Sequence, residues 1–228
     1  MEPRQRALPL PIETHFGRGD FLLSDCNRAA FELIERWPGW PAPALVLYGP
    51  SGSGKTHLMH LWCERSGAVL LSGGGPALAD PTALPPILAI DHGELAAERS
   101  LLHVYNHTLE RNGSLLLTLP RAPASSAIAL ADLASRLRSL PAVGIAPPDD
   151  ALLQAVLVKH FTDRQLRVPP EILAYLLPRI ERSFAAIAAI AARLDALALE
   201  TRRPVTISLA RAVLAELDQS PPSDFTVT

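Results

Sequence analysis

Apolar and polar positions along this chain follow one pattern up to about residue 148 and another beyond it. In the first part, short apolar runs typical of buried strands alternate with segments of helical periodicity. We expect strands at 44–48, 68–71, 87–91, 114–118 and 142–146, and helices at 26–36, 55–66, 98–111 and 130–138. Strands that alternate with helices form a parallel sheet covered on both faces, so we predict an α/β fold with a five-stranded parallel sheet.

The second part is almost wholly helical and predicts a small all-helical domain. Asp149 and Ser208 are suitable N-caps, and a proline pair at 169–170 suits a first helical turn. We expect helices at 150–164, 169–179, 183–200 and 207–217. The expected organisation is an extended arm at 1–12, an α/β core at 13–148, the helical domain at 149–219 and a loose tail at 220–228.

Composition narrows the classes of function. The 228 residues include 48% hydrophobic ones, enough for a sizeable core. With 21 basic and 23 acidic residues and no basic block, there is no footprint for sequence-specific binding to duplex DNA. Cys26 and Cys63 match no metal-site spacing, and a reduced cytoplasmic interior is the simplest interpretation. No run reaches about 18 apolar residues, so we expect no membrane span.

A glycine-rich loop stands between the first expected strand and the helix that follows it. Glycines allow backbone N–H groups to turn inward onto a polyphosphate, and the helix start adds partial positive charge. In this pattern Lys55 reaches the β- and γ-phosphates and Thr56 ligates Mg²⁺. The alternative, a chance glycine-rich turn, is expected in roughly one chain in a hundred. The loop consists of Gly49, Pro50, Ser51, Gly52, Ser53, Gly54, Lys55 and Thr56.

The strand expected at 87–91 ends in an acidic residue, as in a Walker B motif. Asp91 would support Mg²⁺ near the phosphates, the alternative being an aspartate that merely ends a strand. Related ATPases often have a carboxylate at the next position to orient the attacking water, but this chain has His92. We expect Glu94 to lie on a different side of the chain. We therefore predict at most weak ATP hydrolysis by this chain alone.

Three segments resemble one family of AAA+ proteins, that of the bacterial replication initiator DnaA and its short relative Hda. Residues 47–60, which include His57, are similar to that family's phosphate-loop region. Phe21 and Leu22 lie in a segment that resembles its adenine-binding side, and residues 132–137 resemble its arginine-finger box. The resemblance covers 13–217 and implies an AAA+ core and a lid domain that bind ADP or ATP with Mg²⁺.

The resemblance also assigns roles to arginines. Arg136 would be the finger that acts in trans on ATP held by DnaA, with Arg138 as a nearby competitor. Arg182 resembles the sensor-2 arginine that reaches from the lid to bound phosphates, the alternative being a solvated residue or a partner of Glu181. Pro120 stands where the family usually has aspartate, so no polar sensor-1 residue is assigned.

The N-terminal arm is similar to the Gln-x-x-Leu-Pro-Leu peptide by which Hda docks on the DNA polymerase III sliding clamp (beta subunit). Gln5 would bond at the rim of an apolar pocket that Leu8 and Leu10 fill, and Pro9 would lower the ordering cost. Together with a length similar to that of Hda, this implies a negative regulator of replication initiation with the clamp and DnaA as partners. A homodimer is compatible with that reading.

Two other function classes stay open. A self-contained ATPase such as a DnaC-type helicase loader would need its own complete hydrolytic site, which His92 disfavours. A small-molecule kinase would need a substrate lid inserted in the core. His103 and His107 are spaced as an i, i+4 metal pair, but no third ligand is evident and a helix surface is favoured.

Overall fold

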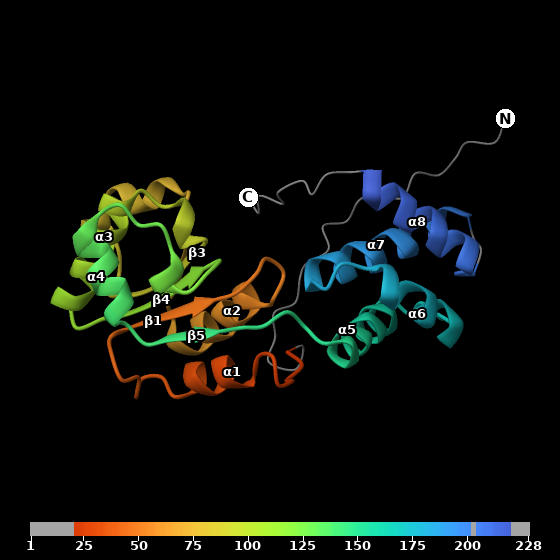
Figure 1. The fold of residues 1–228 in the computed structure, drawn as a ribbon, viewed down its shortest axis with the longest axis horizontal. Helices are drawn as coiled ribbons and strands as arrows, with labels where there is room; N and C mark the ends of the chain where they lie inside the picture. Colours follow the sequence, from red (N-terminus) through yellow and green to blue (C-terminus); the bar gives the residue numbers. More distant parts are fainter. Residues whose placement is uncertain (1–20, 202–203, 220–228) are drawn as a thin grey trace. The chain divides into compact units, whose positions relative to one another are not determined.

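The structure is a computed structural model that describes residues 21–201 and 204–219. The chain divides into two compact units, and the division falls between Pro147 and Pro148 (Figure 1). The residues expected to bind the clamp, Gln5, Leu8, Pro9 and Leu10, lie outside the described residues, as does the tail at 220–228.

The first unit contains the predicted five-stranded parallel sheet. Its order is β2-β3-β4-β1-β5, so β4 lies between β1 and β3 and all three end at the same edge. The three central strands β1, β3 and β4 are buried on both faces, which explains their continuous apolar runs. Their bounds are β1 Ala44–Tyr48, β2 Val69–Ser72, β3 Ile87–Asp91, β4 Ser114–Leu119 and β5 Ala142–Gly144.

Two pairs of helices cover the two faces of this sheet (Figure 1). Successive side chains of a strand point to opposite faces, so Val46 packs with α3 and α4 and Leu47 packs with α1 and α2. The helices are α1 Arg28–Glu35, α2 Lys55–Ser66, α3 Glu98–Glu110 and α4 Ala131–Ser139. Short 3₁₀ turns span Pro76–Ala79, Pro81–Ala83, Gly93–Leu95 and Pro123–Ser125.

The second unit is helical, as predicted, and has its own core, which includes Leu157, Leu176 and Ile187. Its helices are α5 Asp150–Asp163, α6 Pro170–Leu176, the 3₁₀ turn η6 Leu177–Arg179, α7 Phe184–Thr201 and α8 Ile207–Gln219. The α-helix expected to run to residue 179 ends at Leu176 and continues as η6, where Pro178 has no N–H to donate to the helix.

One predicted N-cap of this unit is confirmed and the other is wrong. Asp149 accepts a hydrogen bond of 2.7 Å from the backbone N–H of Leu152 and so caps α5. At the start of α8, the N–H of Leu209 donates to the hydroxyl of Thr206 at 3.2 Å, not to Ser208. The helix begins one residue before Ser208, and this places Thr206 at the capping position.

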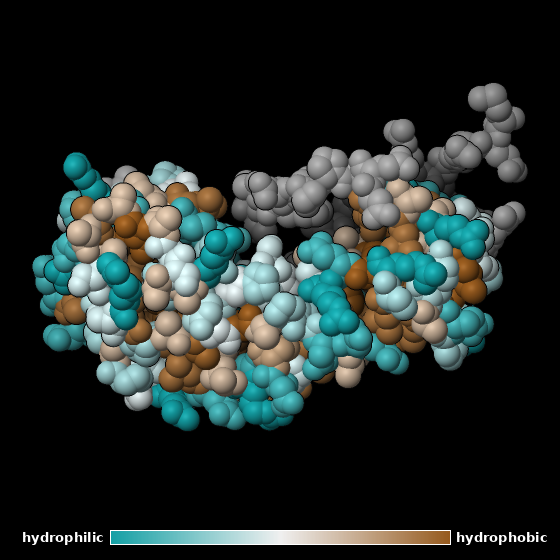
Figure 2. Space-filling view, in the orientation of Figure 1, coloured by the Kyte–Doolittle hydropathy of each residue, from teal (hydrophilic) through white to brown (hydrophobic). Residues whose placement is uncertain are grey.

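Hydrophobic residues reach the surface of both units only in small separate patches on the face shown in Figure 2, with hydrophilic residues between them. The most exposed large apolar side chains, Leu95 at 62% and Leu199 at 64%, belong to different units. Scattered apolar residues of this kind are normal for a protein surface and do not by themselves mark an interface.

Candidate nucleotide site and arginine box

The glycine-rich loop joins β1 to α2 and has the backbone conformations that a phosphate cradle requires. Gly54 has φ of 97° in the left-handed region and stands immediately before α2. A side chain at Gly49 would place its Cβ 2.4 Å from the carbonyl oxygen of Ile145, so glycine is needed there to let β5 approach. The expected strand, loop and helix are therefore present in the expected order, and the loop fits a polyphosphate.

The lysine of this loop is held over its backbone. Lys55 Nζ donates hydrogen bonds of 2.8 Å to the carbonyl oxygens of Gly49 and Pro50. Burial lowers the pKa of Lys55, and the nearby carboxylates of Asp91 and Glu94 partly offset that effect. An ammonium group has three donors, so one remains for a phosphate oxygen while the loop holds the other two.

Polar side chains from three segments meet at the end of β3. Thr56 donates to Asp91 Oδ2 at 2.7 Å, and Thr118 donates to Asp91 Oδ1 from the neighbouring strand β4. The N–H of His92 also reaches Asp91 Oδ1, at 3.1 Å. Thr56 and Asp91 were predicted from the sequence, and the structure brings them together. Thr118 was not predicted. The available signal was a polar residue that follows three leucines near the end of the strand 114–119.

The donor atoms at this place suit a magnesium ion. The Thr56 hydroxyl and the Asp91 carboxylate are hard oxygen ligands of the kind that Mg²⁺ takes together with phosphate oxygens and water. When bound, Mg²⁺ would neutralise charge on the phosphates of the nucleotide. No group of three or more His, Cys, Asp or Glu side chains suited to a metal occurs in the described ranges.

The residues after Asp91 place Glu94 differently from the prediction. His92 adopts the left-handed conformation, with φ of 55°, and the 3₁₀ turn η4 follows it. This reversal returns Glu94 toward the site, where its Oε1 lies 3.4 Å from His92 Nδ1 and its charge partly offsets the lowering of the Lys55 pKa by burial. The prediction that Glu94 lies on a different side of the chain was therefore wrong.

Aromatic rings connect the expected adenine side to the loop helix. Phe21 stacks on Phe31 with ring centroids 5.5 Å apart and meets His57 edge to face at 5.2 Å. The carbonyl of Leu22 accepts a 2.9 Å hydrogen bond from the side chain of Asn27. The structure thus brings together Phe21 and His57, while Phe31 is an additional member that sequence reasoning missed.

The predicted finger residue lies on α4 and is held by two neighbours. Arg136 Nε donates to Asp132 at 2.9 Å, and its guanidinium lies over the ring of Tyr105 in α3, 5.6 Å from the centroid. The hydrogen bond to Asp132 raises the pKa of Arg136, and 39% of the side chain is exposed. The competitor Arg138 donates its Nε to the carbonyl of Ala134 in its own helix.

A glutamate of α3 holds the start of α4, the helix that carries Arg136. Glu98 accepts hydrogen bonds from the N–H groups of Ala129 at 2.9 Å and Leu130 at 2.6 Å. These groups immediately precede α4, where a negative charge also complements the helix dipole. Glu98 and Tyr105 are two helical turns apart on α3, so one side of α3 contacts both the beginning of α4 and Arg136. Sequence reasoning did not identify either contact.

The proposed sensor-2 arginine belongs to the helical unit and precedes α7. Arg182 Nη2 lies 2.9 Å from Asp150 Oδ1, both side chains being exposed, so its ion-pair partner is Asp150 and not Glu181. Ser183 accepts the N–H of Ala186 at 3.1 Å and so fixes the start of α7. The role of Arg182 at the phosphates stays a prediction.

His107 of the histidine pair in α3 contacts the segment that precedes β3. His107 Nε2 lies 3.2 Å from the carbonyl oxygen of Leu84 and 3.4 Å from Arg111 Nη1. These contacts connect α3 to the segment before β3. The favoured interpretation of the pair as part of a helix surface agrees with this geometry.

Comparison with known proteins matches the helical unit to a family and gives the fold of the whole chain. Residues 149–214 match the family model described as "Hda, lid domain". Domain III of the Thermotoga maritima replication initiation protein DnaA aligns at a TM-score of 0.77 and 18% identity, over 92% of this chain and 100% of that one. The helical unit therefore matches the Hda lid family, and the chain as a whole has the fold of DnaA domain III.

Other AAA+ structures agree on the fold. The replication initiator DnaA bound to AMPPCP and single-stranded DNA aligns at a TM-score of 0.66 and 18% identity, over 88% of this chain and 68% of that chain. The Thermotoga maritima RuvB Holliday junction branch migration motor aligns at a TM-score of 0.65 and 15% identity, over 86% of this chain and 69% of that chain. The expected fold, a five-stranded parallel sheet with helices followed by a helical lid, is confirmed. No helix in the described part of the chain has the length and apolarity to cross a membrane.

Proposed function

We propose that this protein is an Hda-like negative regulator of DNA replication initiation in the bacterial cytoplasm. It binds ADP or ATP with Mg²⁺ in the loop 49–56 and docks on the sliding clamp through its N-terminal arm. There it presents Arg136 to ATP held by DnaA and stimulates hydrolysis of that ATP. The initiator is thereby switched off, which limits replication to one round per cycle.

The observation that carries this proposal is the environment of Arg136. Its described contacts are with Asp132 and Tyr105, and none is with the phosphate loop of its own chain. Asp132 accepts from Nε of Arg136. An end-on forked contact to phosphate uses the two terminal nitrogens of a guanidinium, so this hydrogen bond does not compete with it. A partly exposed guanidinium, oriented by a carboxylate and a ring, suits a finger supplied in trans.

The nucleotide site supports a regulatory role over a hydrolytic one. The phosphate loop, Thr56 and Asp91 provide binding groups, but the position after Asp91 carries an imidazole where an ATPase often has a carboxylate. We infer that bound nucleotide sets the shape of this protein and that the chain itself hydrolyses ATP weakly at most.

The deciding experiment measures hydrolysis of DnaA-bound ATP in the presence of DNA-loaded clamp. Arg136→Ala is expected to reduce the stimulated rate by about 10³-fold or more, the usual contribution of an arginine finger. Arg138→Ala is the matched control on the same helix and is expected to stay within about twofold, since its Nε already serves Ala134. Equal stimulation by the wild type and Arg136→Ala would refute the finger assignment.

Clamp docking needs a separate test. Gln5→Ala combined with Leu8→Ala removes the rim hydrogen bond and one apolar anchor, so binding to purified clamp is expected to be lost. Arg136→Ala is expected to bind the clamp normally, which separates docking from chemistry. Retained clamp binding by the double variant would count against the arm.

One observation favours a second candidate, a stand-alone ATPase such as a DnaC-type helicase loader. Glu94 Oε1 lies 3.4 Å from His92 Nδ1, so a carboxylate is present beside the residue that follows Asp91. A turnover above about 1 s⁻¹ without partners, typical of working enzymes, would support that candidate if Glu94→Gln abolished it. Slow turnover that is insensitive to Glu94→Gln would support the regulator.

A further inference from the structure

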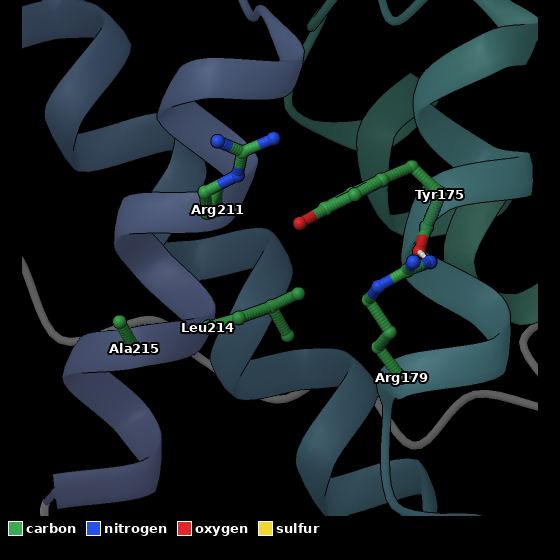
Figure 3. A pocket seen from close by; sticks show the side chains of 5 residues that line it. All are labelled: Tyr175, Arg179, Arg211, Leu214 and Ala215. Atoms are coloured by element: carbon green, nitrogen blue, oxygen red, sulfur yellow. Dashed lines mark hydrogen bonds between the residues drawn. The ribbon is translucent and has the colours of Figure 1, made fainter.

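The helical unit has a groove that no step of the proposed function uses. It has a volume of about 380 Å³ and lies between α6 with η6 on one side and α8 on the other (Figure 3). Its lining combines two arginines with apolar and aromatic surface. The lining residues are Tyr175, Arg179, Arg211, Leu214 and Ala215.

One wall of the groove is prearranged. The Arg179 guanidinium lies over the Tyr175 ring, 4.2 Å from its centroid, and Nη1 donates to the Tyr175 carbonyl oxygen at 2.8 Å. In Figure 3 the Tyr175 hydroxyl points from α6 toward α8, where Arg211 and Leu214 lie. Tyr175 and Leu214 also pack against the core of the unit, so the apolar part of the groove has a fixed base.

The positive charges of the groove have no counter-ion within the described ranges. Neither Arg179 nor Arg211 takes part in an ion pair there. Glu216 follows Ala215 in α8, but both of its carboxylate oxygens accept from Arg193 at 3.0 Å. Among the described side chains, the groove therefore presents two guanidinium groups without an ion-pair partner, beside an aromatic ring and a leucine.

We propose that this groove binds an acidic peptide segment of a partner protein in which a carboxylate stands next to an apolar side chain. Arg211 offers the forked donors that match a carboxylate, and Arg179 adds positive charge on the facing wall. The adjacent apolar side chain packs on the Tyr175 ring and Leu214, contacts that a simple anion could not make. Charge complementarity and this apolar base together select an acidic-apolar segment over an inorganic anion.

The probe for this proposal is the fluorescein-labelled peptide Ser-Leu-Asp-Phe-Gly-Ser, blocked at its C-terminus, with the full-length protein. Fluorescence anisotropy is expected to show saturable binding that weakens with added salt. Arg211→Gln is expected to raise the dissociation constant at least about tenfold, as for loss of a charge-assisted hydrogen bond. Tyr175→Ala is expected to weaken binding as well.

Two controls isolate the chemistry. Arg167→Gln removes an exposed arginine of the same unit that does not line the groove, and it is expected to leave binding unchanged. A peptide with asparagine in place of aspartate is expected to bind at least about tenfold more weakly. Circular dichroism of each variant checks that the helical unit is folded.

Three results would overturn the proposal. They are absence of binding, equal binding of the asparagine peptide, and equal binding by Arg211→Gln. This chain also carries an Asp-Phe pair at 224–225. If a chain ending at residue 219 binds the probe at least about tenfold more tightly than the full chain, the occupant is this chain's own segment and not a partner.

Discussion

The hydroxyl of Thr118 donates a hydrogen bond to Oδ1 of Asp91, across the neighbouring strands β4 and β3. The same hydroxyl accepts the N–H of His92 at 2.9 Å. With Oδ1 held in this way, Oδ2 faces the hydroxyl of Thr56 at 2.7 Å. Thr118 therefore orients the carboxylate that would support Mg²⁺, which explains why a polar residue stands near the end of β4.

Replacing Thr118 by valine tests that role. Thr118→Val keeps the shape of the buried side chain but removes its hydroxyl. Asp91 Oδ1 then loses a donor, and the N–H of His92 loses an acceptor. Loss of a buried partner of a charged group is expected to lower the free energy of unfolding by about 1–3 kcal/mol in urea titrations. The gain in nucleotide affinity on adding Mg²⁺ is also expected to shrink. Thr118→Ser retains the hydroxyl but loses a buried methyl group, so it should keep the wild-type response to Mg²⁺ and lose about 1 kcal/mol of stability.

The pKa of Lys55 gives a pH prediction for nucleotide binding. Only the charged ammonium attracts phosphate, and burial lowers the pKa of Lys55. As pH rises, nucleotide affinity is therefore expected to fall before pH about 10.4, the ordinary lysine value. Lys55→Arg stays charged throughout and should show no such fall, whatever its affinity at neutral pH. An identical pH profile for the two proteins would contradict the assignment of Lys55.

Continuous apolar runs made most of the sheet predictable. The runs at 44–48 and 87–91 give the observed bounds of β1 and β3, because a parallel strand buried on both faces needs no polar position. The loop helix was also placed correctly at 55–66, since a glycine precedes it and another follows it. Where the predicted strand bounds were wrong, as at the end of β5, the difference is one or two residues.

Contacts between segments distant in sequence were not predictable. The pairing of Thr118 with Asp91 depends on β4 lying next to β3, and the order β2-β3-β4-β1-β5 is not written in any local pattern. The position of Glu94 depends on the left-handed conformation of His92, which a histidine rarely adopts. The cap of α8 was assigned to Ser208 because serine and threonine are equally suitable within two residues of the helix start.

Cys63 provides a pH prediction for stability. Burial raises the pKa of its thiol from 9.0 to about 11. The folded protein therefore holds the proton of this thiol up to a higher pH than the unfolded chain does. The stability that comes from the buried neutral thiol is complete below pH 9.0 and is lost as pH rises toward about 11. Urea titrations at several pH values should show a decline over that window that is smaller in Cys63→Ala. Alkylation of Cys63 by iodoacetamide should also be slow at pH 8, since few molecules carry the thiolate.

Glu98 is expected to support the arginine box through the start of α4. Its two carboxylate oxygens accept the N–H groups of Ala129 and Leu130, whereas a glutamine offers one acceptor oxygen and no charge. Glu98→Gln is therefore expected to lower the free energy of unfolding by about 0.5–2 kcal/mol, the range for loss of a helix cap. Urea titration measures that loss.

The same substitution has a functional consequence if Arg136 is the finger. A loosened start of α4 lets the helix that carries Arg136 shift against Tyr105, and a finger works only when its guanidinium is already in place. Stimulation of DnaA ATP hydrolysis by Glu98→Gln is expected to fall, though less than for Arg136→Ala, at a temperature where both variants are folded. Glu110→Gln is the matched control, because Glu110 is an exposed glutamate at the other end of α3. If Glu98→Gln and Glu110→Gln stimulate equally while Arg136→Ala is inactive, α4 holds the arginine without help from α3.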